Sequence, residues 1–447
     1  MPTNRYLEGV YAPVETEVTV TELEVQGTLP DHLDGRYLRN GPNPVDAVDP
    51  ATYHWFTGTG MVHGIRLRDG RAEWYRNRWV RSADVAAIQG EPPRPGPTHG
   101  DFDFSANTNV IGHAGRTFAI VEAGSNPYEL TDELDTIGPC DFDGTLGGGF
   151  SAHPHLDPAT GELHTVSYFW GWGNKVRYSV LSPDAKVTRL VDVDTTGAPM
   201  LHDCALTASS VVIYDLPVTF DLDVALQGSP LPYRWNPEYV PRVGLLPRDG
   251  QSADVQWFEV NPCYVFHTLN AYDDGDTVVL DLVRHPKMFA TDLNGPNEGR
   301  PSLERWTLDR TSGKVLRSPL ADGGHEFPRI DERLTGAPHR YGYTVGIDAD
   351  ATGAVGAENA VYRHDIATGQ TTTRSFGVGS TVREFVFVPR SVDAPEDDGV
   401  LMGFSHDPAT DTGNLQVLDA TTLESVATVP LPVRVPAGFH GNWVPTS

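Results

Sequence analysis

The stretch that decides the fold is Ala360-Val-Tyr-Arg-His-Asp365-Ile-Ala-Thr-Gly369-Gln-Thr-Thr-Thr-Arg-Ser-Phe376. Two runs rich in β-branched and aromatic residues flank a turn that begins at Asp365 and ends at Gly369. An Asp side chain at the first position of such a turn can hydrogen-bond the backbone two residues further on, and Gly supplies the positive φ at its end. The stretch therefore predicts two antiparallel strands joined by a tight turn.

The same style of turn recurs along the chain, at Asp157-Pro-Ala-Thr-Gly161, Asp309-Arg-Thr-Ser-Gly313 and, in a related form, Asp419-Ala-Thr-Thr422. Alternating apolar and polar residues predict further hairpins at 65–80 and 265–283, with turns at Asp69-Gly70 and Asp274-Gly275, and strand pairs at 163–193 and 303–316. Long amphipathic helices are scarce. Repeated β-meanders with one style of turn are typical of a β-propeller.

The length fits one large all-β domain that spans residues 1–447, since no dividing linker interrupts the pattern. Seven blades would take about 64 residues each, more than the ~40–45 of an ordinary propeller blade. We expect the surplus to form inserted loops that cap the substrate face. Residues 214–248, rich in Pro, Leu and aromatic residues, are predicted to be one long inserted loop, which either packs over the barrel top or is partly exposed to a hydrophobic ligand or a membrane.

Composition excludes several classes of function. The formal net charge of -27 argues against nucleic-acid binding and against electrostatic docking to anionic lipid, because both need a basic surface. No apolar run is long enough to span a membrane, and no secretory signal is visible at the start of the chain. The three widely spaced cysteines indicate reduced thiols. We therefore expect a cytoplasmic protein whose only membrane contact would be weak and peripheral, with no protein partner.

Four of the 16 histidines stand out because they lie in apolar or glycine-rich strand contexts: His153, His202, His267 and His440. Three glutamates share this kind of setting: Glu122, Glu326 and Glu384. A charged residue in such a place is costly to bury unless it is paired.

The spacing of these residues indicates a shared site. From His202 the series continues through His267, Glu326, Glu384 and His440 at intervals of 65, 59, 58 and 56 residues. That is one polar residue per blade, as expected if each inner strand directs one side chain at a common axis.

The periodic interpretation leaves the 31-residue interval between Glu122 and His153 unexplained. Neutral imidazoles suit Fe, Zn and Cu, and a ligating His usually donates its other N–H to a carboxylate. The set predicts a metal held by four histidines with three supporting glutamates, and spacing alone does not separate Fe from Zn.

The chain also resembles a known family, the carotenoid cleavage oxygenases, which includes bacterial stilbene-cleaving enzymes and the retinoid isomerohydrolase of the visual cycle. The resemblance runs nearly end to end. Its motifs are Gly35-Arg-Tyr-Leu-Arg-Asn-Gly-Pro-Asn-Pro44, His54-Trp-Phe56, Gly60-Met-Val-His63, Ala106-Asn-Thr-Asn109, Glu122-Ala-Gly124, Ala152-His-Pro-His-Leu-Asp-Pro-Ala-Thr-Gly-Glu162, His202-Asp203, Asp215-Leu-Pro217, Pro241-Arg-Val-Gly-Leu-Leu-Pro-Arg248, Phe266-His-Thr-Leu-Asn-Ala-Tyr272, Glu326-Phe-Pro-Arg-Ile-Asp331, Glu384-Phe-Val-Phe-Val-Pro-Arg390 and Arg434-Val-Pro-Ala-Gly-Phe-His-Gly441.

The resemblance implies a seven-bladed propeller with one Fe(II) on its axis, O2 as co-substrate and a small hydrophobic substrate. The family's iron ligands fall on His153, His202, His267 and His440, and its supporting glutamates fall on Glu122, Glu326 and Glu384. We expect His155, His63 and His325 to be structural. The implied reaction is cleavage of one C=C bond of a carotenoid or apocarotenoid into two carbonyl products, with no general base from the protein.

Three alternatives remain open: cleavage of a stilbene or phenylpropene, isomerisation with ester cleavage, and a scaffold that has lost its metal. The chain departs from the family at Thr57 and Thr59, where acidic residues are common. It also has Val121 where stilbene-cleaving members tend to carry a lysine, which weakens the case for a phenolic stilbene as the substrate. We predict an apolar tunnel that positions the substrate, and its candidate lining residues are Phe169, Trp170, Trp172, Phe266, Phe439 and Trp443.

Overall fold

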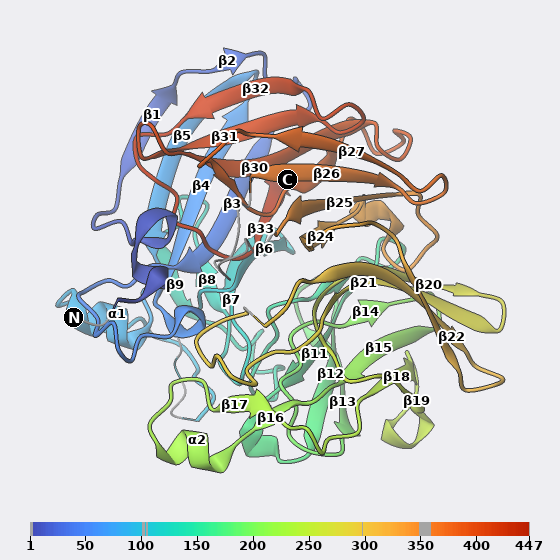
Figure 1. Cartoon of the computed structure of the whole chain (residues 1–447). Coiled ribbons are helices and arrows are strands. Elements are labelled where there is room, and N and C mark those ends of the chain that lie inside the picture. The colour runs from blue at the N-terminus through green and yellow to red at the C-terminus, as the bar shows by residue number, and fades with distance from the viewer. Residues whose placement is uncertain (1–2, 101–102, 104–105, 297, 348–358, 447) are drawn as a thin grey trace.

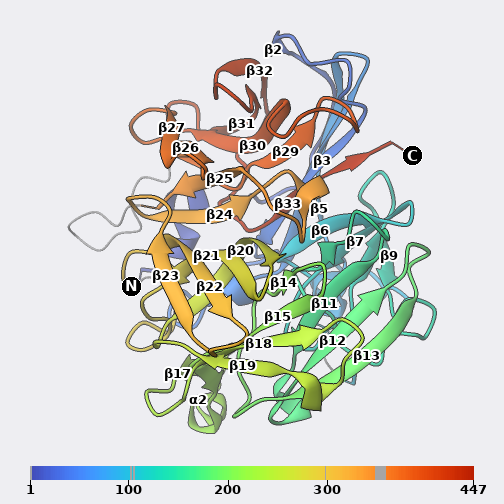
Figure 2. The same ribbon diagram turned by 90° about the vertical axis from the view of Figure 1, so that its right-hand side faces the viewer.

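Local hairpins between strands that follow one another in sequence build most of the fold. The computed structural model describes residues 3–100, 103, 106–296, 298–347 and 359–446. In this part of the chain, seven sheets of four or more strands are arranged in a ring, as a seven-bladed β-propeller (Figures 1 and 2). The all-β prediction is confirmed.

Blades two to six each contain four strands, ordered from the axis outwards. Blade two contains β6 (Asn109–His113), β7 (Arg116–Ile120), β8 (Tyr128–Leu130) and β9 (Thr136–Pro139). Blade three contains β10 (His155–Leu156), β11 (Leu163–Tyr168), β12 (Lys175–Leu181) and β13 (Val187–Asp194). Blade four contains β14 (Ala205–Leu206), β15 (Ser210–Asp215), β18 (Arg242–Pro247) and β19 (Gln256–Glu259). Blade five contains β20 (Tyr264–Asp274), β21 (Thr277–His285), β22 (Ser302–Asp309) and β23 (Val315–Pro319), and blade six contains β24 (His325–Arg329), β25 (Tyr341–Gly346), β26 (Ala360–Asp365) and β27 (Gln370–Ser375).

The first and last blades close the ring by exchanging terminal strands. Blade one has the order β1 (Thr19–Leu23), β5 (Arg71–Trp79), β4 (Gly60–Arg68), β3 (Gly35–Pro42) and β33 (Gly441–Pro445). Blade seven has the order β2 (Gln26–Gly27), β32 (Ser425–Pro430), β31 (Thr412–Asp419), β30 (Gly399–Asp407) and β28 (Thr381–Val382), and β29 (Val386–Pro389) also pairs with β30. The C-terminal strand is thus innermost in blade one, while the N-terminal β2 lies at the outer edge of blade seven. Figure 1 shows these blue and red strands side by side.

Helices are short and lie in the connections between strands. They are η1 (Arg5–Leu7), η2 (Gly9–Tyr11), η3 (Trp55–Thr57), α1 (Ala83–Ile88), η4 (Trp170–Trp172), α2 (Leu222–Leu226), η5 (Ser252–Asp254) and η6 (Glu332–Leu334). Within the described residues, no helix has the length and apolar character needed to cross a bilayer.

The predicted Asp turns form as expected. The side chain of Asp309 accepts hydrogen bonds from the backbone N–H groups of Thr311 and Ser312, at 2.9 and 3.0 Å, and Gly313 has φ +70°. The same side-chain bond forms at the other predicted positions, Asp157, Asp365 and Asp419.

The prediction of one loop over 214–248 is wrong in part. Residues 242–247 form β18, a central strand of blade four that pairs with both β15 and β19. The insertion is shorter: it includes α2 and a two-stranded sheet of β16 (Val218–Phe220) and β17 (Tyr233–Trp235), at one edge of the molecule in both views. The sequence Arg-Val-Gly-Leu-Leu-Pro lacks the alternation of a half-exposed strand because β18 is buried over most of its length.

The core lies between blades. One buried cluster joins β12 and β15 to β21 and β22, and another joins β4 of blade one to β30 of blade seven. The members of both clusters are mainly β-branched and aromatic residues on the facing surfaces of neighbouring sheets. They include the fully buried Trp306 in the first cluster and Tyr37 in the second. This packing fixes the blades as a rigid ring, so the inner strands hold side chains at the axis with little freedom.

Candidate metal centre

The four histidines singled out in the sequence meet at the axis, from blades three, four, five and one. Each lies where its inner strand is irregular. His153 and His202 precede the two-residue strands β10 and β14, and His440 directly precedes β33. His267 lies in β20 where the register with β21 shifts, between Val265 and Thr268. Such interruptions of a ladder re-aim side chains, here towards the axis.

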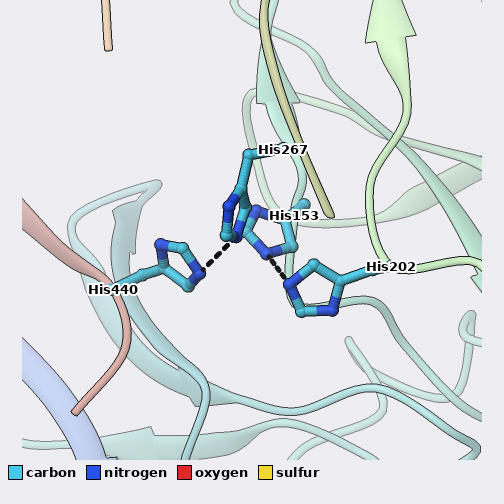
Figure 3. Close-up of side chains that lie close together, drawn as sticks. All are labelled: His153, His202, His267 and His440. Atoms are coloured by element: carbon cyan, nitrogen blue, oxygen red, sulfur yellow. Dashed lines mark hydrogen bonds between the residues drawn. The ribbon is translucent and has the colours of Figure 1, made fainter. Parts of the chain in front are cut away.

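The imidazole rings converge closely (Figure 3). Each offers one ring nitrogen, and these four nitrogens lie within 4.8 Å of one another. The Nε2 atoms of His153 and His202 are 2.9 Å apart, and those of His267 and His440 are 3.1 Å apart.

Three glutamates accept hydrogen bonds from the opposite side of the rings. Glu122 Oε2 lies 2.8 Å from Nδ1 of His202. Glu326 Oε2 lies 2.5 Å from Nδ1 of His267, and Glu384 Oε1 lies 3.0 Å from Nδ1 of His440. Within the described residues, no carboxylate contacts the ring of His153.

This arrangement fits a cation. Because carboxylates only accept, the Nδ1 atoms of His267 and His440 carry the protons, and their Nε2 lone pairs face each other 3.1 Å apart. Neither Nε2 can donate to the other in the neutral state, so the pair repels unless a cation lies between the nitrogens. Four neutral imidazole nitrogens with carboxylates behind them are the donor set that Fe, Zn or Cu takes in proteins.

Burial and charge set the protonation of these groups. Burial lowers the pKa of His153 well below its usual value, with the neighbouring histidines adding to the effect. Burial also lowers the pKa of His440, to about 4, although Glu384 opposes it. Both rings are therefore neutral near pH 7 and ready to bind a metal. The pKa of His267 is raised: burial lowers it, but the charge and hydrogen bond of Glu326, together with the charges of Asp203 and Glu384, outweigh burial.

The carboxylates are held as anions. Burial alone would raise the pKa of Glu384, but Arg329 and His440 lower it to about 2. Burial is likewise outweighed at Glu326, whose pKa is lowered by His267 and His285. These groups stay charged throughout the physiological range and accept hydrogen bonds from the rings.

Two residues of this network were missed in the sequence analysis. His285, at the end of β21, donates from Nε2 to Glu326 Oε1 at 2.8 Å. Arg329 donates to Glu384 Oε1 at 3.3 Å and to the side chain of Asn442 at 2.9 Å. Neither belongs to the one-per-blade series, although Arg329 stands inside the Glu326-Phe-Pro-Arg motif.

An apolar cavity opens on one side of the histidine cluster. Three of the histidines, His202, His267 and His440, line it together with Glu122 and Glu326. Its aromatic and apolar wall comes from connections between strands and from β17, β20 and β24, and includes Tyr6, Tyr11, Trp55, Phe56, Trp170, Leu231, Tyr233, Phe266, Phe327 and Phe439.

The structure divides the predicted tunnel residues into two groups. Trp170, Phe266 and Phe439 line the cavity, as expected. Contrary to expectation, Phe169 and Trp172 are outside its lining, and their rings pack edge to face with centroids 5.8 Å apart. Trp443 lines a second cavity instead.

The second cavity lies on the other side of the cluster and is more polar. His153, His267 and His440 reach it, with His155, Asp203 and Arg329 in its wall. Histidines of one cluster thus line both an apolar cavity and a more polar one. His155 takes no part in the cluster; its Nε2 donates to Asp203 Oδ1 at 2.8 Å.

The departures from the family pattern are local. Thr57 Oγ1 donates to the carbonyl of His54 at 3.1 Å, and Thr59 Oγ1 donates to that of Asn43 at 2.8 Å. Val121 lines the apolar cavity beside Glu122.

Comparison with known proteins gives consistent matches over the whole chain. The family described as retinal pigment epithelial membrane protein matches residues 11–445. A carotenoid cleavage oxygenase of Mycobacterium tuberculosis is 51% identical, over 99% of this chain and 98% of its own length. An isoeugenol monooxygenase of Pseudomonas nitroreducens is 31% identical, over 98% of each chain. The crystal structure of a Pseudomonas brassicacearum lignostilbene dioxygenase superposes with a TM-score of 0.90 at 29% identity, over 100% of both chains.

Proposed function

Since the chain belongs to the family of the retinal pigment epithelial membrane protein and the carotenoid cleavage oxygenases, we propose that it is a non-haem Fe(II) dioxygenase. Its reaction would cleave one C=C bond of a carotenoid or apocarotenoid, with the two atoms of O2 ending in two carbonyl products. The observation that carries the proposal is the position of His202, His267 and His440 in the wall of an apolar cavity. A long conjugated hydrocarbon in that cavity would have a double bond next to the metal.

His153, His202, His267 and His440 would hold the Fe2+, and Glu122, Glu326 and Glu384 would orient the three rings that they contact. When bound, the iron would supply the activation of O2 for attack on the alkene. Four neutral ligands would not balance the positive charge of the ion. The three carboxylates would supply the compensating charge from behind the rings, through their hydrogen bonds to the Nδ1 atoms. No protein base is needed, since alkene scission by O2 moves no proton.

The cavity wall would select and align the substrate. Phe327 lines the cavity and stacks on the His267 ring, with centroids 5.4 Å apart and an interplanar angle of 27°. Phe56 and Phe439 meet edge to face at 5.6 Å, and Phe266 adjoins Phe56 at 6.0 Å. Rigid aromatic faces near the metal would hold one double bond in place and exclude water.

Product analysis tests the proposal. The iron-loaded protein is incubated with carotenoids, apocarotenals, stilbenes and isoeugenol under 18O2, and products are identified by mass spectrometry. We expect apocarotenoid aldehydes or ketones that carry 18O. Scission products without 18O, or the absence of scission on the whole panel, would contradict the proposal.

Cleavage of a shorter stilbene or phenylpropene is the second candidate. The similarity to an isoeugenol monooxygenase and a lignostilbene dioxygenase favours it. Val121 in the cavity wall does not, because it offers no charge or hydrogen bond to a phenol. The ratio of kcat/KM for an apocarotenal to that for isoeugenol decides between the two.

The insertion in blade four supports a weak peripheral membrane contact. Leu222 and Leu226 of α2 are 61% and 77% exposed, and Pro230–Pro232 of the same insertion line the apolar cavity. This arrangement would let a lipid-soluble substrate pass from a bilayer into the cavity. Flotation with neutral vesicles tests it: Leu222→Ser with Leu226→Ser should abolish co-flotation, and wild-type protein that stays wholly unbound would contradict it.

The buried cysteines support a reducing, cytoplasmic location. Cys140, Cys204 and Cys263 are all free thiols in the described structure. Fractionation of the source cells, with antibody detection, tests this placement.

A further inference from the structure

A single buried carboxylate connects three of the four histidine-bearing segments. Asp203 follows His202, and its Oδ1 accepts from Nε2 of His155 at 2.8 Å and from its neighbour Cys204 N–H at 2.7 Å. Its Oδ2 accepts from the backbone N–H of Thr268 at 2.7 Å. His155 is two residues beyond His153, and Thr268 directly follows His267.

Asp203 therefore spans blades three, four and five, where the sheet ladders fix the backbone least. The strands after His153 and His202 are only two residues long, and His267 lies in an irregular part of β20. The ladder hydrogen bonds run within each blade, and β10, β14 and β20 belong to three different sheets, so the ladders do not tie these segments to one another. A buried anion with three donors does so at the depth of the ligands.

The fourth ligand has a comparable backbone tie. Glu384 accepts from Nδ1 of His440 and, through Oε2, from the backbone N–H of Gly441 at 2.8 Å. His440 is thus fixed by its own glutamate. His153 has no carboxylate on its ring in the described part of the chain, so the tie at His155 is its link to the other ligands.

We propose that Asp203, with His155, is a positioning residue of the metal centre: the buried pair sets the separation of the segments that carry His153, His202 and His267, so that their Nε2 atoms converge. The inference rests on the proposed role of the four histidines as metal ligands. The hydrogen bonds of Asp203 go to His155 and to the backbone, its charge also acts on the His267 ring, and it does not line the apolar cavity.

The same side chains do not form a second metal site. His155, Asp203 and Cys204 each offer a ligand atom within 4.8 Å of the others. Both oxygens of Asp203 are already occupied by N–H donors. Burial raises the pKa of the Cys204 thiol well above its usual value, which keeps it protonated and a poor ligand. A tie between segments accounts for all of these contacts.

The test compares two buried carboxylates of blade four. Asp203→Asn is the perturbation, because an amide keeps the shape but replaces one acceptor by a donor that faces an N–H. Asp215→Asn is the matched control: Asp215 is also fully buried and accepts from Tyr239, Arg242 and the N–H of Thr196, at the far end of β15.

Co2+ is titrated into the metal-free full chain while its d–d absorption bands are recorded, and the melting temperature of each variant is measured alongside. Asp203→Asn should weaken Co2+ binding about ten-fold or more and shift the bands, as loss of an outer support typically does. Asp215→Asn should keep wild-type affinity and spectrum, even where its melting temperature falls as much. A loss of stability alone does not move the spectrum, so the bands separate positioning from folding.

If Asp203→Asn does not fold, substitutions of His155 test the inference instead. His155→Gln keeps a donor that reaches Asp203 and should bind Co2+ nearly as tightly as the wild type, whereas His155→Leu should bind about ten-fold more weakly. Wild-type affinity and bands in both Asp203→Asn and His155→Leu would overturn the inference and leave the metal centre intact. Failure of the wild type itself to bind Co2+ would overturn both.

Discussion

Replacing Glu326 by Gln tests how far the carboxylates strengthen the metal site. The two oxygens of Glu326 accept from three donors: Nδ1 of His267 at 2.5 Å, Nε2 of His285 at 2.8 Å and the backbone N–H of Phe327. Gln has one acceptor oxygen. If that oxygen takes the place of Oε2, it keeps His267 and the N–H of Phe327, and its NH2 group faces His285, which can accept by changing tautomer.

The structure then predicts that the substitution removes charge but no hydrogen-bonded contact. A hydrogen bond to a charged group contributes about 1.5–3 kcal/mol, and one between neutral groups about 0.5–1.5 kcal/mol. The difference of about 1–1.5 kcal/mol corresponds to roughly a ten-fold loss of metal affinity. Metal affinity falls because the imidazole of His267 becomes less basic: a neutral acceptor polarises the Nδ1–H bond less than a carboxylate does.

The assay is anaerobic competition for Fe2+ against a chromogenic chelator, with a thermal melt of each variant. Glu304→Gln is the control, since Glu304 is also buried and accepts from Trp306 and Arg317 on blade five, away from the axis. We expect Glu326→Gln to bind Fe2+ about ten-fold more weakly and Glu304→Gln to bind it as the wild type does. Equal affinity in Glu326→Gln and the wild type would refute the role assigned to the carboxylate.

Three further perturbations follow from the geometry. His267→Ala should leave less than one tenth of the wild-type iron per chain and no alkene scission, and scission that survives would remove His267 from the ligand set. Phe439→Leu, in the cavity wall, should lower kcat/KM about ten-fold or alter the ratio of products, whereas Phe169→Leu, outside it, should do neither; the reverse pattern would contradict the cavity assignment. Burial lowers the pKa of His63 and His364 to about 3, and that of His54 and His164 to about 4. Below about pH 6.5 the unfolded chain therefore binds protons that the folded chain does not. Urea unfolding should show the free energy of unfolding falling between pH 6.5 and 4, by up to about 1.4 kcal/mol per pH unit for each of these histidines, with a shallower fall in His63→Gln. A flat profile would contradict this.

The parts of the fold that depend on local sequence could be predicted. An Asp turn needs only its own five residues, so Asp309 and Gly313 were sufficient to place a turn between β22 and β23. At the related turn after Asp419 the positive φ falls on Leu423, at +61°, which shows that the Asp side chain matters more than the Gly. The turn after Asp407, in which Asp411 has the positive φ, forms the same side-chain bond but was not predicted.

The parts that depend on strand irregularity could not be predicted. Phe169 and Trp170 are adjacent where β11 ends and η4 begins, yet Trp170 lines the cavity, as does Tyr168, and Phe169 does not. His285 lies 18 residues after His267 on the neighbouring strand and pairs with Tyr264, just before the register shift of β20 against β21 that contains His267. Side-chain direction at such breaks is set by tertiary packing, which no periodicity of sequence records.

The seven blades also explain why one histidine lacks a carboxylate. Each blade contributes one member of the set: Glu122, His153, His202, His267, Glu326, Glu384 and His440 come in order from blades two to seven and then blade one. Glu122 follows β7, the second strand of its blade, which accounts for the short interval before His153. Four histidines taken from seven positions leave three for carboxylates, whereas four complete pairs would need eight.

The histidine without a carboxylate is His153, whose blade lies between those of Glu122 and His202, the pair that bonds across it. A ligand with no glutamate behind its ring has to be placed by its backbone. The bond from its N–H to Ser151 Oγ at 3.1 Å and the tie from His155 to Asp203 both act there. With an odd number of blades, one histidine has no carboxylate partner. That histidine is His153, and its segment is the one that Asp203 connects to the other histidines through His155.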